Sequence, residues 1–114
     1  MLAVIFEVTP TKEGKEEYLE IASKLRVFLQ DQKGFISIER FQSLVEEDKV
    51  LSLSFWENEA DIEVWRNLLE HRHGQQTGKE KLFHSYRIRV AEVVRDYTEI
   101  ERKEAPSDSN RTLC

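Results

Sequence analysis

The chain has 114 residues, of which 39% are hydrophobic and 34% are charged, and its formal net charge is −5. This length suits one globular domain with its own core, and the negative charge disfavours nucleic acid as a partner because phosphate binding requires a basic surplus. No apolar run approaches the roughly 20 residues that a membrane span needs, so no membrane association is expected.

The first predicted element is a strand over residues 2–8, "LAVIFEV". The run is apolar and β-branched almost throughout, and Thr9 and Pro10 stop it. A strand that is apolar on both faces is typical of the centre of a sheet. No basic segment precedes the run, so a cleaved signal peptide is not expected.

A helix is predicted next, over residues 12–31. Its apolar residues repeat as one stripe of a 3.6-residue helix: Tyr18, Ile21, Ala22, Leu25, Phe28 and Leu29. Thr11 is placed to cap its start, and Gly34 is placed to end it.

Two strands with period-two alternation follow, over residues 35–44 and 50–58, joined by the acidic turn "VEEDK". Asn58 and Asp61 then resemble a capping box at the start of a second helix. Ile62, Trp65 and Leu69 form the apolar stripe of this helix.

The stretch "WRNLLEHRHGQ" poses a geometric problem within the second helix. Trp65 and His71 are six positions apart, or ~240° around a helix axis, and so cannot share a face of an unbroken helix. We therefore predict a break between about Leu68 and Arg72 that turns His71 inward and leaves His73 in solvent.

The final predicted strand, residues 83–97, is long, and its apolar alternation changes phase after Val90. Such a slip predicts a bulge or bend and a far end that pairs outside its own sheet. The domain is therefore placed at residues 1–97, and the polar tail at 98–114 is expected to be disordered. Cys114 is the only cysteine, which excludes a disulfide within the chain and favours a cytoplasmic protein.

The order of elements, β-α-β-β-α-β, predicts the α+β class with a ferredoxin-like antiparallel sheet and both helices on one face. The other face requires a second covering layer, because the first strand is apolar on both sides. We expect a second copy of the chain to supply it, burying a face that includes Phe41 and Trp56.

The stretch "SLSFWENEADIEVWR", a histidine soon after it and the closing "YRIRVAEVVRDY" resemble the antibiotic biosynthesis monooxygenase (ABM) family. The resemblance covers roughly residues 2–97. It implies a dimeric α+β barrel, in which two sheets pack together and each protomer has a pocket between its sheet and helices. It also implies one of several activities, since the family includes cofactor-independent monooxygenases of aromatic polyketides or quinols and haem-degrading proteins.

The resemblance assigns catalytic positions to Glu7, Trp65 and His71. Family members usually have asparagine where this chain has Glu7, and an ionised carboxylate cannot donate a hydrogen bond. Glu7 is therefore either a base with a raised pKa or the partner of an arginine such as Arg87 or Arg89. Trp65 is either a core residue or a pocket wall, and His71 is either a structural histidine or a site residue.

Four further aromatic residues are candidates for substrate contact: Phe41, Trp56, Phe83 and Tyr86. No metal site is expected, because His71 and His73 do not converge on a helix and no metal-binding motif is present. No cofactor is expected either. Glu7 and the charges that flank His71 disfavour haem.

Two functions from different classes remain open. The first is a monooxygenase that oxidises a small aromatic or quinol-like compound with dioxygen and without a cofactor. The second is a non-catalytic homodimer that binds a small molecule, which would have a packed and dry interior. A haem-degrading relative ranks third.

Overall fold

The computed structural model describes residues 1–77 and 83–113, with side chains described for residues 1–68 and 83–110. The elements follow the predicted order, with one short helix added at the C-terminus. They are β1 (Leu2–Pro10), α1 (Gly14–Leu29), β2 (Phe35–Gln42), β3 (Val50–Trp56), α2 (Glu59–Thr77), β4 (Phe83–Glu92) and α3 (Ser107–Leu113).

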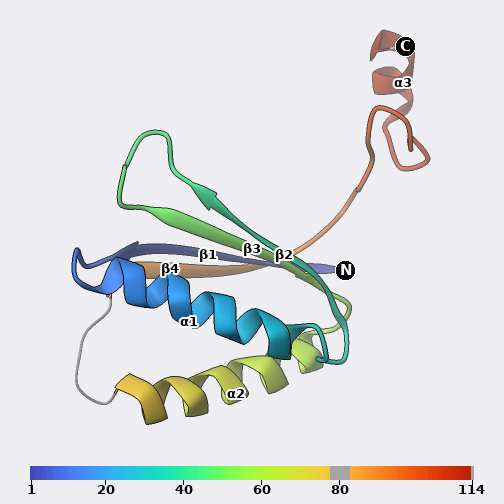
Figure 1. Cartoon of the computed structure of the whole chain (residues 1–114). Helices are drawn as coiled ribbons and strands as arrows, with labels where there is room; N and C mark the ends of the chain where they lie inside the picture. The colour runs from blue at the N-terminus through green and yellow to red at the C-terminus, as the bar shows by residue number, and fades with distance from the viewer. Residues whose placement is uncertain (78–82, 114) are drawn as a thin grey trace.

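The four strands form one antiparallel sheet in the order β2-β3-β1-β4. Helices α1 and α2 both lie on one side of it, which we call the helix side, while the opposite surface, the open face, has none of the described elements packed over it (Figure 1). The ferredoxin-like α+β fold is therefore confirmed, and the apolar strand β1 is central.

The register of β1 explains its two-sided apolar composition. Leu2, Val4, Phe6 and Val8 belong to clusters of side chains beneath the helices. Alternation then places Ile5 and Glu7 on the open face, opposite Leu53 and Leu51 of β3. One set of apolar side chains of β1 thus packs beneath the helices, and the other set lies beside the apolar side chains of β3 on the open face.

Two groups of buried residues join the sheet to the helices. The first, near the start of α2, contains Leu29, Trp56, Ile62 and Trp65. The second, near the start of α1, contains Val8, Tyr18 and Val50, with Phe6 and Phe83 packed against it. Of the predicted apolar stripe of α1, Tyr18, Ala22 and Leu29 are buried, whereas Phe28 is 39% exposed.

The caps of α1 are Glu13 and Gln30 and not the expected Thr11 and Gly34, which lie outside the helix and shape the turns beside it. The Thr11 hydroxyl accepts a hydrogen bond from the Gly14 amide at 2.9 Å, before the first turn of α1. Gly34 has φ +79° at the turn into β2. Asn58 Nδ2 donates to Asp61 Oδ2 at 3.3 Å at the start of α2.

The predicted break in the second helix is wrong. Helix α2 runs without interruption from Glu59 to Thr77. The prediction assumed that His71 faces the same side as Trp65. The continuous backbone of α2 shows that this assumption does not hold. In a continuous helix the Cα of His71 lies ~240° around the axis from that of Trp65.

Three other expectations need correction. Trp56 is 1% exposed on the helix side and therefore does not belong to the open face with Phe41. The irregular pairing of β4 lies at its start, opposite Thr9 and Pro10, and the strand ends at Glu92 without a bend after Val90. The tail, expected to be disordered, contains α3 and a hydrogen-bonded loop.

The tail leads away from the sheet and ends in α3 at a distance from the rest of the fold (Figure 1). Across the described residues, the helices include none that combines the length and the apolar composition required to cross a membrane.

Candidate functional site

The side chains between the sheet and the helices form the first candidate region. Trp56 of β3 and Trp65 of α2 lie there with ring centroids 6.5 Å apart and ring planes at 31°. Their exposed fractions are 1% and 9%. Trp56 Nε1 donates to Ser54 Oγ at 3.0 Å, which satisfies the buried indole. The two candidate tryptophans are thus brought together, as a packed pair within the core.

A group of aromatic rings lies around the second buried cluster, and we call it the aromatic cluster: Phe6, Tyr18, Phe83 and Tyr86. Phe83 contacts Tyr18, Phe6 and Tyr86 with centroid separations of 5.5, 6.2 and 6.3 Å, and Phe6 lies 5.8 Å from Tyr86. Phe83 and Tyr86 are candidates from the sequence, whereas Phe6 and Tyr18 become visible only in the fold. Strand alternation could have indicated Phe6, because Phe6 is two residues from the buried Val8 and therefore lies on the same face of the strand.

The helix side of β4 continues this cluster as an exposed apolar row. Tyr86, Ile88 and Val90 pair with Val8, Phe6 and Val4 of β1 and therefore share their side of the sheet. They are nevertheless 63%, 53% and 49% exposed. An apolar surface beside the aromatic cluster is thus open to a ligand.

Glu7 and Phe41 lie on the other side of the sheet from Trp65. Glu7 accepts a hydrogen bond from Arg89 Nη1 at 3.1 Å, and Lys49 Nζ lies 3.7 Å from its second carboxylate oxygen. The predicted pairing of Glu7 with an arginine is confirmed for Arg89. Phe41, 42% exposed, pairs with Leu51 on the open face. Neither residue shares a site with Trp65 inside one protomer.

The histidines contribute little to the described part of the site. The side chains of His71 and His73 lie outside the described residues, and His84 is exposed at the start of β4. Within residues 1–77 and 83–113, no three His, Cys, Asp or Glu side chains gather in a way that would hold a metal ion.

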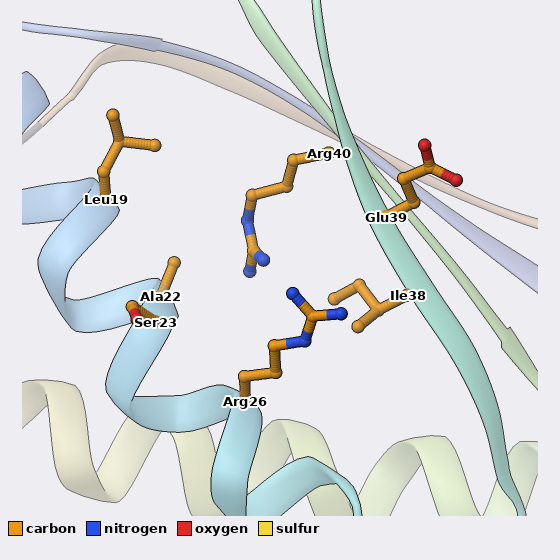
Figure 2. Close-up of a pocket in the computed structure, with 7 residues that line it drawn as sticks. All are labelled: Leu19, Ala22, Ser23, Arg26, Ile38, Glu39 and Arg40. Carbon is orange, nitrogen blue, oxygen red and sulfur yellow. The ribbon is translucent and has the colours of Figure 1, made fainter.

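A second candidate region is a hollow of about 340 Å³ between α1 and β2. Figure 2 shows the guanidinium groups of Arg26, from α1, and Arg40, from β2, pointing into the same space, while the Glu39 carboxylate points away from it. The apolar side chains that line it are Leu19, Ala22 and Ile38. This region was not predicted from the sequence. The only signal for it is that Arg26 and Arg40 are charged residues next to the apolar residues of their helix and strand.

Comparison with known proteins relates this geometry to a family. The family model described as antibiotic biosynthesis monooxygenase matches residues 1–77. A jasmonate monooxygenase of Pyricularia oryzae is 39% identical over 93 residues, which are 82% of this chain and 43% of that protein. The protein YqjZ of Bacillus subtilis, which is uncharacterised, is 33% identical over 93 residues, or 82% of this chain and 79% of its own length.

Solved structures agree on the fold. The haem degrader MhuD from Mycobacterium tuberculosis, solved with two haems in its active site, aligns with a TM-score of 0.67 and 13% identity. The alignment covers 86% of this chain and 100% of that one. At that identity the likeness concerns the fold alone. The present chain also spans less than half of the Pyricularia oryzae relative.

Proposed function

The chain belongs to the antibiotic biosynthesis monooxygenase family, and from that membership we propose that it oxidises a small ring compound with dioxygen. The observation that carries the proposal is the 39% identity with a jasmonate monooxygenase across 82% of this chain. The exposed apolar row of β4 beside the aromatic cluster supports it, because it offers flat apolar contacts to a ring.

The substrate class follows from this surface and from electron balance. An aromatic or quinol-like compound with an activated methylene can become a ketone and release water, so that the substrate supplies all the electrons for dioxygen. Such a reaction requires no cofactor. A single hydroxylation, by contrast, requires two further electrons from a reductant, and an assay on jasmonate must therefore include one.

The candidate residues, including His71 whose side chain lies outside the described residues, divide the work as follows. Phe83 and Tyr86 contact the ring, and the Tyr86 hydroxyl hydrogen-bonds a substrate oxygen. Trp65 packs on Trp56 in the other buried cluster, near the start of α2, and has a structural role. We assign the base to His71 of α2, because imidazole titrates near neutral pH. Glu7 is held by Arg89 and Lys49 on the opposite face and has a structural role.

The proposed active form is a homodimer. The open face presents an apolar patch of five side chains from three strands: Ile5, Phe41, Leu51, Leu53 and Phe55. A second copy that packs its own open face on this patch would bury it and surround the Glu7 ion pairs. Each protomer's helix side remains accessible in such an arrangement.

The test is oxygen uptake with a panel of anthrone, a reduced quinol, and jasmonate with ascorbate. We expect turnover with at least one compound and a loss of about 100-fold or more in Tyr86→Ala or His71→Ala, the range for a lost acid–base group. Glu7→Gln serves as the control and should keep its activity. Turnover that persists in His71→Ala but vanishes in Glu7→Gln would contradict the assigned roles.

The alternative is a non-catalytic homodimer that binds a small molecule. The packing of Trp56 and Trp65, with 1% and 9% of their surfaces exposed, favours it, because a packed interior leaves little room for reaction beside them. Saturable binding of a panel compound without oxygen uptake, in the presence and absence of ascorbate, would establish this alternative and refute the monooxygenase.

Haem provides a separate prediction. In the described part of the chain, the ring of Trp65 meets Trp56 and other core side chains, so a porphyrin would have to displace a packed cluster. We expect weak and non-saturating spectral changes on haem titration. A saturable Soret shift at one haem per chain that disappears in His71→Ala would contradict this.

A further inference from the structure

The hollow between α1 and β2 contains two positive charges that face each other. Arg26 projects from the exposed surface of α1, and Arg40 projects from the helix side of β2, where its partner in the sheet is the buried Ser52. Both guanidinium groups point into the same space (Figure 2). Like charges that share one space repel each other.

Nothing among the described residues compensates these charges. Of the side chains that line the hollow, Glu39 alone is acidic, and its carboxylate points away (Figure 2). The Nε atom of Arg40 is buried and has no hydrogen-bond partner. Leaving a buried donor of a charged group unpaired is costly, and native proteins rarely do so without a reason. An anion in the hollow would accept from Arg40 and relieve the repulsion.

The lining indicates which anion fits. Leu19, Ala22 and Ile38 supply an apolar wall beside the two guanidinium groups. A guanidinium binds a carboxylate through two parallel hydrogen bonds, and the apolar wall suits a hydrocarbon body. We propose that Arg26 and Arg40 bind the carboxylate of a small organic acid whose apolar part lies against Leu19, Ala22 and Ile38.

The hollow also adjoins one of the two buried clusters of the core. Ile38 lines the hollow and packs against the buried cluster that contains Trp56 and Trp65. An acid anchored by the two arginines would therefore direct its apolar end toward this cluster. The binding of this acid does not rest on the proposed function.

The test compares octanoate with octanamide, which has a similar shape but no charge, by calorimetric titration of the full chain under nitrogen. Octanoate should bind at least about tenfold more tightly than octanamide, because charge-assisted hydrogen bonds are lost with the amide. Arg26→Met and Arg40→Met should each weaken octanoate binding about tenfold or more and leave octanamide unaffected. The affinity of Arg40→Lys for octanoate should lie between those of the unchanged protein and Arg40→Met, because lysine keeps the charge but lacks the planar guanidinium group.

Arg66→Met is the matched control, because Arg66 is an exposed arginine of α2 outside the hollow. It should bind octanoate as the unchanged protein does. Arg40→Met removes an unpaired buried donor, so its melting temperature should not fall, and circular dichroism confirms its fold.

Three results would overturn the proposal: equal affinity for octanoate and octanamide, unchanged affinity in Arg40→Met, or saturable binding of inorganic phosphate with none of octanoate. The titration involves no oxidation. Binding with these properties therefore stands even if every oxygen-uptake assay fails, and a failed titration leaves the oxygen-uptake result unaffected.

Discussion

Gly34 is the residue whose backbone most tightly limits substitution. Its φ is +79°, in the left-handed region, and a Cβ atom built on it would overlap the Asp61 carboxylate. Its carbonyl also accepts a hydrogen bond from the Glu57 amide at 2.8 Å. The turn from α1 into β2 therefore passes directly against the start of α2, and only glycine permits this approach without strain.

Gly34→Ala is expected to lower the free energy of unfolding by about 1–3 kcal/mol, the cost of holding a non-glycine residue in a strained conformation. Urea denaturation measures this change. In an Asp61→Ala background the same substitution should cost less, because the overlap is removed while the backbone strain remains. An equal cost in both backgrounds would show that Asp61 is not the obstacle.

Ser54 provides a second test at the level of one side chain. It is 7% exposed and accepts the hydrogen bond of the Trp56 indole at 3.0 Å. Ser54→Ala leaves that N–H buried and unpaired, which should cost about 1–3 kcal/mol of unfolding free energy.

Ser52→Ala is the matched control. Ser52 is equally buried on the same strand face, and Trp56 donates to Ser54 instead. In denaturant titrations, Ser52→Ala should lower the free energy of unfolding clearly less than Ser54→Ala does. Similar decreases in both variants would contradict the assigned role of the hydrogen bond.

Glu7 shows where reasoning from the sequence fails at this scale. Strand alternation places the Glu7 side chain on the opposite face of the sheet from Phe6 and Val8, which face the helices. In a strand that is apolar on both faces, however, the sequence does not reveal which of the two alternating sets of side chains faces the helices. The same ambiguity put Trp56 on the wrong side, since large apolar residues on both sides of β3 make either assignment plausible.

At the scale of elements, the sequence predicted the order and type of every helix and strand of the domain. These predictions depended on periodicities of 2 and 3.6 residues, which the burial of one face imposes directly. The continuity of α2 was not predictable in this way, because the break was inferred from a supposed role of His71 and not from any helix-breaking residue. The Arg26 and Arg40 hollow was also missed, since it depends on two elements that are adjacent only in the fold.

The Arg102 side chain links several parts of the C-terminal tail. Its guanidinium donates to the Thr98 carbonyl at 3.0 Å, to Asn110 Oδ1 at 2.7 Å and to Ser109 Oγ at 3.1 Å. It also lies 5.2 Å from the centroid of the Tyr97 ring. A polar segment with few apolar residues thus gains order from a network of hydrogen bonds.

Arg102→Met should therefore loosen the tail without affecting the domain. We expect faster amide hydrogen exchange across residues 98–110, with the exchange of β1 and the melting temperature unchanged. Lys103→Met, which alters the neighbouring exposed cation, is the control. Unchanged exchange in Arg102→Met would contradict the role of this network.

At the scale of the whole molecule, the apolar open face predicts self-association. Leu53 lies near the middle of that face, paired with Ile5 on one side and Glu39 on the other. Leu53→Arg would place a charge in the proposed interface, where burying it unpaired costs several kcal/mol. We expect this variant to sediment as a monomer under conditions in which the unchanged protein is a dimer.

Val64→Arg is the control for this experiment. Val64 is 61% exposed on α2, away from the open face, and its substitution should leave the dimer intact. A monomeric unchanged protein, or a Leu53→Arg variant that remains a dimer, would refute sheet-to-sheet association.

The central place of β1 has a consequence for synthesis of the chain. This strand is translated before both of its neighbours, β3 and β4, which are completed only at Trp56 and Glu92. At roughly 5–20 residues per second, the segment remains without its first neighbour for about 2–10 s. Over that interval a β-branched apolar segment with unpaired backbone groups is open to pairing with other chains. Chaperone capture of the nascent β1 segment, and aggregation when expression outpaces folding, are therefore to be expected for this topology.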